Sequence, residues 1–251
     1  MASLSGPRLK VARAHQHLKA LEREIQSFAK SKPCNVVSEF DPKTGEKVWR
    51  VQGNPATPPV TLSPIIGDTL YNFRSAFDHL AWQLVDANGQ TPTRFNAFPI
   101  CDSPEDFKRN GRSKIKGMSR EAKTAVKWYQ PYYGRHSYRD SMLLWLEALC
   151  NTDKHRHFNL VAAATDGGIF NPGLPVIVGS SNPYSIYEGA VEEGTELARI
   201  PGEYVDVQFY PAIGIAFGQG GPAARESVRL ILAGINAIVE FILNDFSRFF
   251  A

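Results

Sequence analysis

Three residues able to do chemistry, Arg74, Asp78 and His79, interrupt an apolar stretch at residues 63–88. An arginine can hold an anionic group through paired hydrogen bonds. A histidine can donate or accept a proton near neutral pH because the pKa of its imidazole lies there. Arg74 and Asp78 are four residues apart and can also pair along a helix. These side chains predict either acid–base chemistry on an anionic substrate or an ion pair beside a buried helix face.

A second charged cluster, Asp153-Lys154-His155-Arg156-His157, follows the apolar segment at residues 140–153. Apolar residues lie on nearly every side of that segment, which is typical of a buried helix. We expect this helix to pack on the one containing Arg74. The packing would bring the two charged clusters to a single site.

The segment Arg74-Ser75-Ala76-Phe77-Asp78-His79 resembles the R-x(4–6)-H motif of the HEPN superfamily. Many members of this superfamily of helical proteins are metal-independent endoribonucleases that cleave RNA through internal attack of the 2′-hydroxyl at a dimer cleft. The resemblance implies that Arg74 holds the scissile phosphate and that His79 acts as acid or base. It also implies a homodimer and no cofactor. If the two charged clusters meet as expected, the supporting or ligand-binding residues would be Asp78, Asp153, Lys154, His155 and Arg156. The wider pattern, GDTLYNFRSAFDHLAWQL followed by LCNTDKHRHF and IAFGQGGP, resembles bacterial proteins without implying an activity.

A divalent-metal site is an alternative interpretation of the second cluster. Asp153, His155 and His157 alternate, so on an extended segment they would point to one side as metal ligands do. His79 or Glu147 could complete such a site. The positive charges of Lys154 and Arg156 argue against a bound cation.

Two further interpretations use the same residues without catalysis. Lys154, His155 and Arg156, with Arg74 opposite, would suit a phosphate or carboxylate ligand or an anionic partner. Alternatively, the charged residues form ion pairs that only fix helix packing, Asp153 with Arg74 or Asp78 with Arg156.

A net charge of +3 is too small to indicate nucleic-acid binding by the chain as a whole. The most basic local run lies at residues 108–116, and such runs are usually exposed surface without function. The aromatic residues that follow it are Trp128, Tyr129, Tyr132, Tyr133 and Tyr138. They could line a groove that stacks bases, although packing at the rim of the core is the commoner role.

Helical periodicity and end signals predict the elements that position these residues. We expect helices at residues 7–30, 63–88, 103–108, 119–130, 140–153 and 222–246. The turn residues at 41–45 predict a β-hairpin at about residues 34–53. Short strands are expected at residues 158–164, 174–179, 185–188, 196–200, 204–210 and 213–217.

The order of these elements predicts an α+β fold, with a helical core and an inserted β-hairpin followed by a small antiparallel sheet and a long C-terminal helix. We expect a mainly helical part at residues 1–156 and a strand-rich part at 157–251, which includes the C-terminal helix. The two parts should pack as one unit.

Three widely spaced cysteines, Cys34, Cys101 and Cys150, fit neither a disulfide framework nor a zinc-binding spacing. The first residues lack the apolar core of a signal peptide. The longest apolar run, at residues 230–243, is interrupted by Asn236 and Glu240, so no membrane span is expected. These features predict a cytoplasmic protein. The HEPN resemblance implies RNA as its partner, and the charged residues of the two clusters alternatively favour a small anionic ligand.

Overall fold

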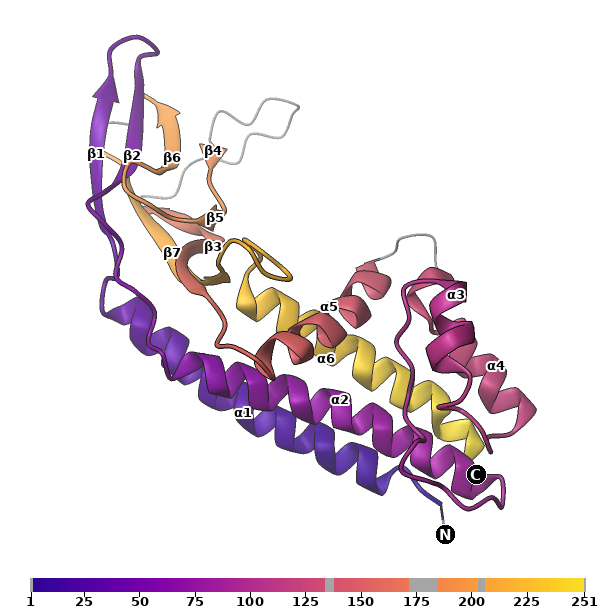
Figure 1. Cartoon of the computed structure of the whole chain (residues 1–251). Coiled ribbons are helices and arrows are strands. Elements are labelled where there is room, and N and C mark those ends of the chain that lie inside the picture. Colours follow the sequence, from indigo (N-terminus) through magenta and orange to yellow (C-terminus); the bar gives the residue numbers. More distant parts are fainter. Residues whose placement is uncertain (1, 134–137, 172–184, 203–205, 251) are drawn as a thin grey trace. The chain divides into compact units, whose positions relative to one another are not determined.

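The chain folds into helices and two antiparallel sheets, which confirms the predicted α+β class (Figure 1). The computed structural model describes residues 2–133, 138–171, 185–202 and 206–250. The predicted strand at residues 174–179 lies outside these ranges. The β-hairpin and the long C-terminal helix are both present where the sequence predicts them.

The predicted helices form close to their expected bounds, with short additional turns at three places. The α-helices are α1 (Ser5–Lys30), α2 (Leu62–Ala87), α3 (Pro104–Asp106), α4 (Arg120–Trp128), α5 (Tyr138–Asp153) and α6 (Val228–Asp245). One turn of π-helix, η1 (Phe107–Gly111), continues α3, and the 3₁₀ turns are η2 (Pro131–Tyr133) and η3 (Phe246–Phe249). Ser103 and Ser119 cap α3 and α4 by accepting backbone N–H bonds, as expected for serine before a helix.

Seven strands make up the two sheets in the described part of the chain. They are β1 (Asn35–Asp41), β2 (Glu46–Gln52), β3 (Leu160–Asn171), β4 (Ser185–Ile186), β5 (Gly189–Ala190), β6 (Glu196–Pro201) and β7 (Gln208–Phe217). The first sheet has the order β1-β2-β6-β4 and the second has the order β5-β3-β7. The hairpin turn lies between Asp41 and Glu46, and Gly45 adopts a φ of 72° there.

Strands β3 and β7 differ most from their predicted bounds, while β4 is shorter than predicted and β5 was not predicted. Strand β7 joins residues 208–210 of the first predicted strand to the predicted strand at 213–217, because Pro211 remains in register opposite Gly168 instead of ending the strand; residues 204–205 lie outside the described ranges. Strand β3 extends to Asn171, with an irregularity between Ala164 and Gly168. Pro211 is tolerated because β7 is an edge strand, whose outer side needs no ladder donor.

The chain divides into two compact units, and each combines segments that are distant in the sequence. Unit 1 contains Met1–Leu21, Ser63–His157 and Leu230–Ala251, and unit 2 contains Glu22–Leu62 and Phe158–Arg229. The β-hairpin therefore belongs with the later strands, and most of the C-terminal helix belongs with the earlier helices. This division differs from the predicted grouping at residue 156, which followed chain order.

Unit 1 is a helical bundle in which α1 and α2 run antiparallel (Figure 1). Near one end, the backbone N–H of Ser3 donates to Gln83 at 2.8 Å, while further along α1 His17 lies 4.0 Å from Asp68. Helix α1 also contacts α6, because the His15 ring nitrogen lies 2.7 Å from the Asn236 side-chain oxygen. The core includes fully buried aromatic side chains, Phe73, Phe77, Phe98 and Phe246.

The C-terminal helix begins at Val228, later than the predicted residue 222. Ala223 and Arg225 adopt positive φ values of 55° and 69°, which no right-handed helix accommodates. Residues 228–249 are long and apolar enough to cross a membrane by length and composition alone. In the most apolar 18-residue segment of this helix, 44% is buried inside the protein. The core helix of a globular protein can have the same length and composition.

Candidate functional site

Each nitrogen of the Arg74 guanidinium donates a hydrogen bond to a neighbouring group of unit 1. Its Nε donates to Glu147 Oε2 at 3.0 Å, its Nη1 to Asp78 Oδ1 at 2.9 Å, and its Nη2 to the Phe98 carbonyl at 2.8 Å. The Arg74 side chain is only 15% exposed. These bonds join α2 to α5 and to the loop at Phe98, so Arg74 stabilises the packing of the bundle.

Asp78 completes this network as an acceptor. Its Oδ1 also accepts the backbone N–H of Phe98 at 3.1 Å. Burial raises the pKa of Asp78, while Arg74 and the Phe98 N–H oppose that shift by stabilising the charged form. The predicted i,i+4 pair of Arg74 and Asp78 is confirmed, and Glu147 is the second carboxylate, which the sequence interpretation did not assign to Arg74.

His79 lies on a different side of α2 from Arg74. Its side chain is exposed, and a Cβ placed on Gly6 of α1 would lie 3.2 Å from its Nδ1. Arg74 instead faces α5 and Phe98. Because successive helical residues turn by about 100°, five positions carry the two side chains well apart around the helix. One copy of the chain does not bring the predicted catalytic pair together.

The second charged cluster is at the end of α5, where Asp153, Lys154, His155, Arg156 and His157 are all exposed. Burial and the nearby charge of Asp68 raise the pKa of Asp153, and the charge of His157 opposes the shift. Asp153 therefore does not pair with Arg74, whose carboxylate partners are Asp78 and Glu147. Asp78 accordingly pairs with Arg74 and not with Arg156.

The metal-ion alternative required an extended segment after residue 153, and the backbone forms a turn there. The N–H groups of His155 and Arg156 both bond to the Thr152 carbonyl, at 3.1 and 3.0 Å. Across the described ranges, no three His, Cys, Asp or Glu side chains are grouped as metal ligands. Asp153, His155 and His157 consequently do not form the alternative site.

A groove of about 890 Å³ in unit 1 gathers positive charge that the sequence analysis had treated as exposed surface. We call it the basic groove. It is lined by Pro104, Phe107, Lys108, Arg112, Ser113, Ile115, Lys116, Arg120, Lys123, Thr124, Lys127 and Tyr132. Six of these twelve residues are cationic and none is acidic, so the groove carries a positive electrostatic potential.

The secondary structure explains how the cations come to face one groove. Arg120, Lys123 and Lys127 have the i, i+3, i+7 spacing of one face of α4. Lys108 and Arg112 are on η1 and at its C-terminal end, and Lys116 is in the turns that follow. Within the part of the chain that the structure describes, none of these six side chains forms an ion pair with a carboxylate.

The Tyr132 hydroxyl is buried at the wall of the basic groove and has no hydrogen-bond partner among the residues that the structure describes. Burial raises the pKa of this phenol, with smaller contributions from Cys101 and Tyr133. A buried hydroxyl without a partner costs about 1–3 kcal/mol, and an acceptor from a ligand would remove that cost. The unsatisfied donor therefore points to a ligand that carries hydrogen-bond acceptors.

Two exposed aromatic rings lie beside the basic groove. Trp128 and Tyr133 are 62% and 48% exposed, and their ring centroids are 5.3 Å apart. The ammonium group of Lys127 lies 5.9 Å from the Tyr133 ring centroid. Flat rings next to cations can stack on bases while the cations bind phosphates.

The basic groove had a signal in the sequence, namely the run at 108–116 and the cationic face of the predicted helix at 119–130. What the sequence could not show is that the two segments face each other. Comparisons of the chain with models of protein families, with curated proteins and with solved structures find no match.

Proposed function

We propose that the protein binds single-stranded nucleic acid without catalysis, through the basic groove. The observation that supports this proposal is a groove lined by six cations and no carboxylate, with a buried Tyr132 hydroxyl that has no partner in the described ranges. Phosphates would bind to Lys and Arg on both walls, and one phosphate or base oxygen would accept from Tyr132. Trp128 and Tyr133 would stack on bases at the edge of the groove.

Charge reversal on both walls tests the proposal. Lys116 and Lys127 are exposed and belong to opposite walls, so Lys116→Glu with Lys127→Glu should leave the fold intact. We expect binding of a fluorescein-labelled oligouridylate to weaken at least about tenfold, and the slope of log affinity against log salt to flatten by about 1.4 for two lost phosphate contacts. Fluorescence anisotropy at several salt concentrations measures both.

The matched control is Lys19→Glu with Arg23→Glu, which changes the net charge equally at two exposed residues of α1 outside the basic groove. We expect this variant to bind within about twofold of the unaltered protein. If both variants weakened binding equally, the net charge of the protein and not the basic groove would account for the affinity. No binding of oligouridylate by the unaltered protein would refute the proposal.

Tyr132→Phe provides a second test at the same groove. Removing an unsatisfied hydroxyl should leave the free energy of unfolding unchanged or slightly raised in the free protein. The same change should weaken oligonucleotide binding several-fold, because the bound acceptor loses its donor. A variant that binds unchanged would show that the hydroxyl does not contact the ligand.

The endoribonuclease activity implied by the HEPN resemblance is a separate proposal. It needs Arg74 to contact a scissile phosphate, whereas three of the arginine donors already bond within unit 1. Its test is RNA cleavage in the presence of a chelator by the unaltered protein and by His79→Ala. Cleavage that His79→Ala abolishes in a folded protein would establish the activity and replace the non-catalytic proposal.

A further inference from the structure

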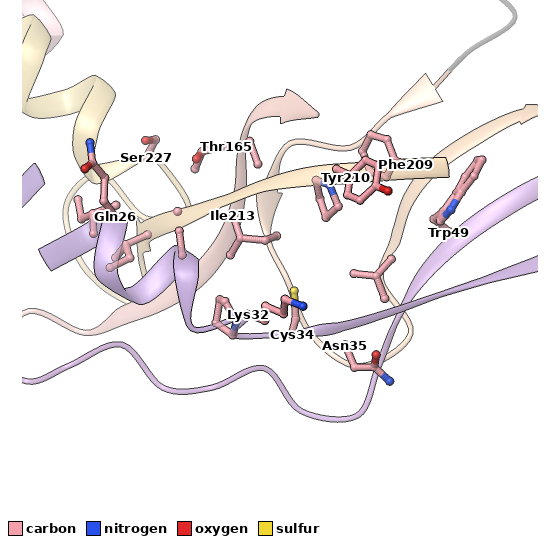
Figure 2. A pocket seen from close by; sticks show the side chains of 18 of the residues that line it. Gln26, Lys32, Cys34, Asn35, Trp49, Thr165, Phe209, Tyr210, Ile213 and Ser227 are labelled. Atoms are coloured by element: carbon pink, nitrogen blue, oxygen red, sulfur yellow. The ribbon is translucent and has the colours of Figure 1, made fainter. Parts of the chain in front are cut away.

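A second groove, of about 820 Å³, lies entirely within unit 2 and is independent of the basic groove (Figure 2). One wall is formed by β7 and the other by the chain that leaves α1 and enters β1. Figure 2 shows β7 passing across the groove, with Lys32, Cys34 and Asn35 on the opposite segment. Because its lining involves the edges of both sheets, we call it the edge groove.

The way β7 lines the edge groove shows that the strand presents its backbone. All eight consecutive residues from 208 to 215 are in the lining. A strand that faced a cavity with one side would contribute every second residue, because successive side chains point to opposite faces. Consecutive residues mean that the hydrogen-bonding edge of the strand, and not one of its faces, borders the groove.

Hydrogen bonds at the end of β7 identify which backbone groups point into the groove. The Phe217 N–H donates to the Glu226 carbonyl, and the Phe217 carbonyl accepts from the Arg225 N–H, both on the side away from β3. Backbone groups alternate in direction along a strand, so those of Ile213 and Phe209 face the same outer side. Pro211 offers only its carbonyl there, as is usual for proline on an edge strand.

The outer side of β7 is open over residues 208–215 within the described ranges. The second sheet ends at β7, and the isolated bridge from Ala216 to Ser227 covers only the far end of the strand. The opposite wall, residues 32–36, leads into β1, which is itself an edge of the first sheet. The edge groove is therefore flanked by two open strand edges.

Side chains at the edge groove favour an apolar partner with one acidic group. Trp49 and Phe209 pack against each other with centroids 5.9 Å apart, and Ile213 adds an aliphatic surface. Of the three charged lining residues, Glu22 lies 3.7 Å from Arg229. Lys32 has no carboxylate partner among the described residues and could pair with an acidic side chain of a ligand.

We infer that unit 2 binds an extended peptide segment of a partner protein, which adds as a further strand to the open edge of β7. Only a polypeptide backbone repeats N–H and C=O groups at the spacing that an edge strand requires. Residues of alternating apolar character would contact Ile213 and the small accessible parts of the largely buried Trp49 and Phe209, and an acidic residue would lie near Lys32.

The probe is a C-terminally amidated heptapeptide, DVTVSVT, with fluorescein coupled to its N-terminal amine. Its matched control has the same side chains but carries N-methyl groups on alternate amides, which removes the donors of one edge. We expect the unmodified peptide to bind at least about tenfold more tightly than the N-methylated one in fluorescence anisotropy. Equal binding of the two peptides, or no binding up to about 1 mM, would overturn the inference.

Cys34 reports whether the peptide occupies the edge groove, because its thiol is half-buried in the lining. We expect the unmodified peptide to slow alkylation of Cys34 by N-ethylmaleimide several-fold, as followed by mass spectrometry, and the N-methylated peptide to leave it unchanged. Binding without protection of Cys34 would place the peptide elsewhere and refute the site.

A pair of variants tests the edge from the protein side. Ile213→Pro removes the outward N–H, whereas Ile213→Ala shortens the side chain to a similar extent and keeps that N–H. We expect Ile213→Ala to weaken binding moderately through the lost aliphatic contact, and Ile213→Pro to weaken it at least about tenfold further because the outward N–H is also lost; equal weakening by the two substitutions would contradict the edge pairing. If Ile213→Pro does not fold, the two peptides still decide the question.

Light scattering tests whether a second copy of the chain occupies the edge groove instead. A dimer whose Cys34 is protected before peptide is added would contradict the inference. Oligouridylate binding should not change in either variant, which separates this result from the proposed function.

Discussion

The Arg74 Nε lies 3.0 Å from Glu147 Oε2, and this bond joins α2 to α5 across 73 positions of sequence. Arg74 bonds at the same time to Asp78 and to the Phe98 carbonyl. A guanidinium placed between two carboxylates and a carbonyl has a structural task, because removing it leaves two acids close together without compensation.

Arg74→Ala should therefore destabilise the protein. We expect a loss of about 2 kcal/mol in the free energy of unfolding, below the full value for a buried pair because the carboxylates are partly exposed. Urea unfolding followed by circular dichroism measures this loss. His79→Ala is the control on the same helix and should change stability by less than about 0.5 kcal/mol, since His79 is exposed. Equal effects of the two substitutions would contradict the structural role of Arg74.

Gly67→Ala should destabilise α2, although glycine to alanine within a helix normally stabilises by about 0.5–1 kcal/mol. A Cβ at position 67 would overlap the Asp153 carboxylate at the end of α5. We expect a net loss of about 1–3 kcal/mol from this overpacking. Thermal and urea unfolding measure the loss in the single variants and in the double variant Gly67→Ala with Asp153→Ala. We expect the double variant to recover most of the loss, because the carboxylate that meets the new Cβ is absent. Gly221→Ala, where a Cβ meets nothing within 4 Å, should stay within about 0.5 kcal/mol. A stabilised Gly67→Ala variant would show that the close approach is absent.

The three cysteines should differ in reactivity. Burial raises the pKa of Cys101 and of Cys150 to about 12, and both thiols lie in the core. Very little thiolate is then present at neutral pH, and the thiolate is the reactive form. Cys34 is half-exposed, although burial raises its pKa as well. We expect N-ethylmaleimide to modify Cys34 first in the native protein, and all three cysteines to react rapidly in urea. Mass spectrometry of digested samples identifies the modified thiol. Rapid native labelling of Cys150 would contradict its placement.

Arg199 in β6 should make the stability of the first sheet depend on acid. Its guanidinium donates to Glu46 at 2.7 Å and to Glu196 at 2.8 Å, and these bonds lower the pKa of both carboxyl groups. The pKa of Asp41 is lowered mainly by the Lys43 backbone N–H, with a contribution from Arg199. Lowered pKa values in the folded state mean that this stabilisation is present above the unfolded values, near pH 4, and is lost as the pH falls through the folded values.

The difference in unfolding free energy between the unaltered protein and Arg199→Met should therefore shrink between about pH 5 and pH 3. Urea titrations across this range measure the unfolding free energy of both proteins. The raised pKa values of Asp78 and Asp153 have the opposite effect on stability, but they are common to both proteins and cancel in the difference. Arg23→Met, an exposed change with no carboxylate partner in the described part of the chain, should show no such pH dependence. A constant difference for Arg199→Met would mean that its hydrogen bonds do not shift the three pKa values.

Local features of the sequence were sufficient to predict most elements of secondary structure. Helices α2, α4 and α5 form near their predicted bounds, because apolar periodicity and capping serines act over a few residues. The turn at 41–45 was also predictable, since Asp, Pro and Gly favour it directly. Helix α6 began late because Ala223 and Arg225 hold left-handed backbone conformations that their residue types do not suggest.

Taken alone, the sequence determined the α+β class, the hairpin, the helix faces and the pairing of Arg74 with Asp78, which all depend on residues within a few positions of one another. Only the tertiary structure decided that Glu147 is the second partner of Arg74, that His79 points elsewhere, and that two basic segments share one groove. It also decided that the hairpin joins the later strands in unit 2. The physical reason is that these relationships arise from packing between residues far apart in the chain, and periodicity shows which face of an element is buried but not what it packs against.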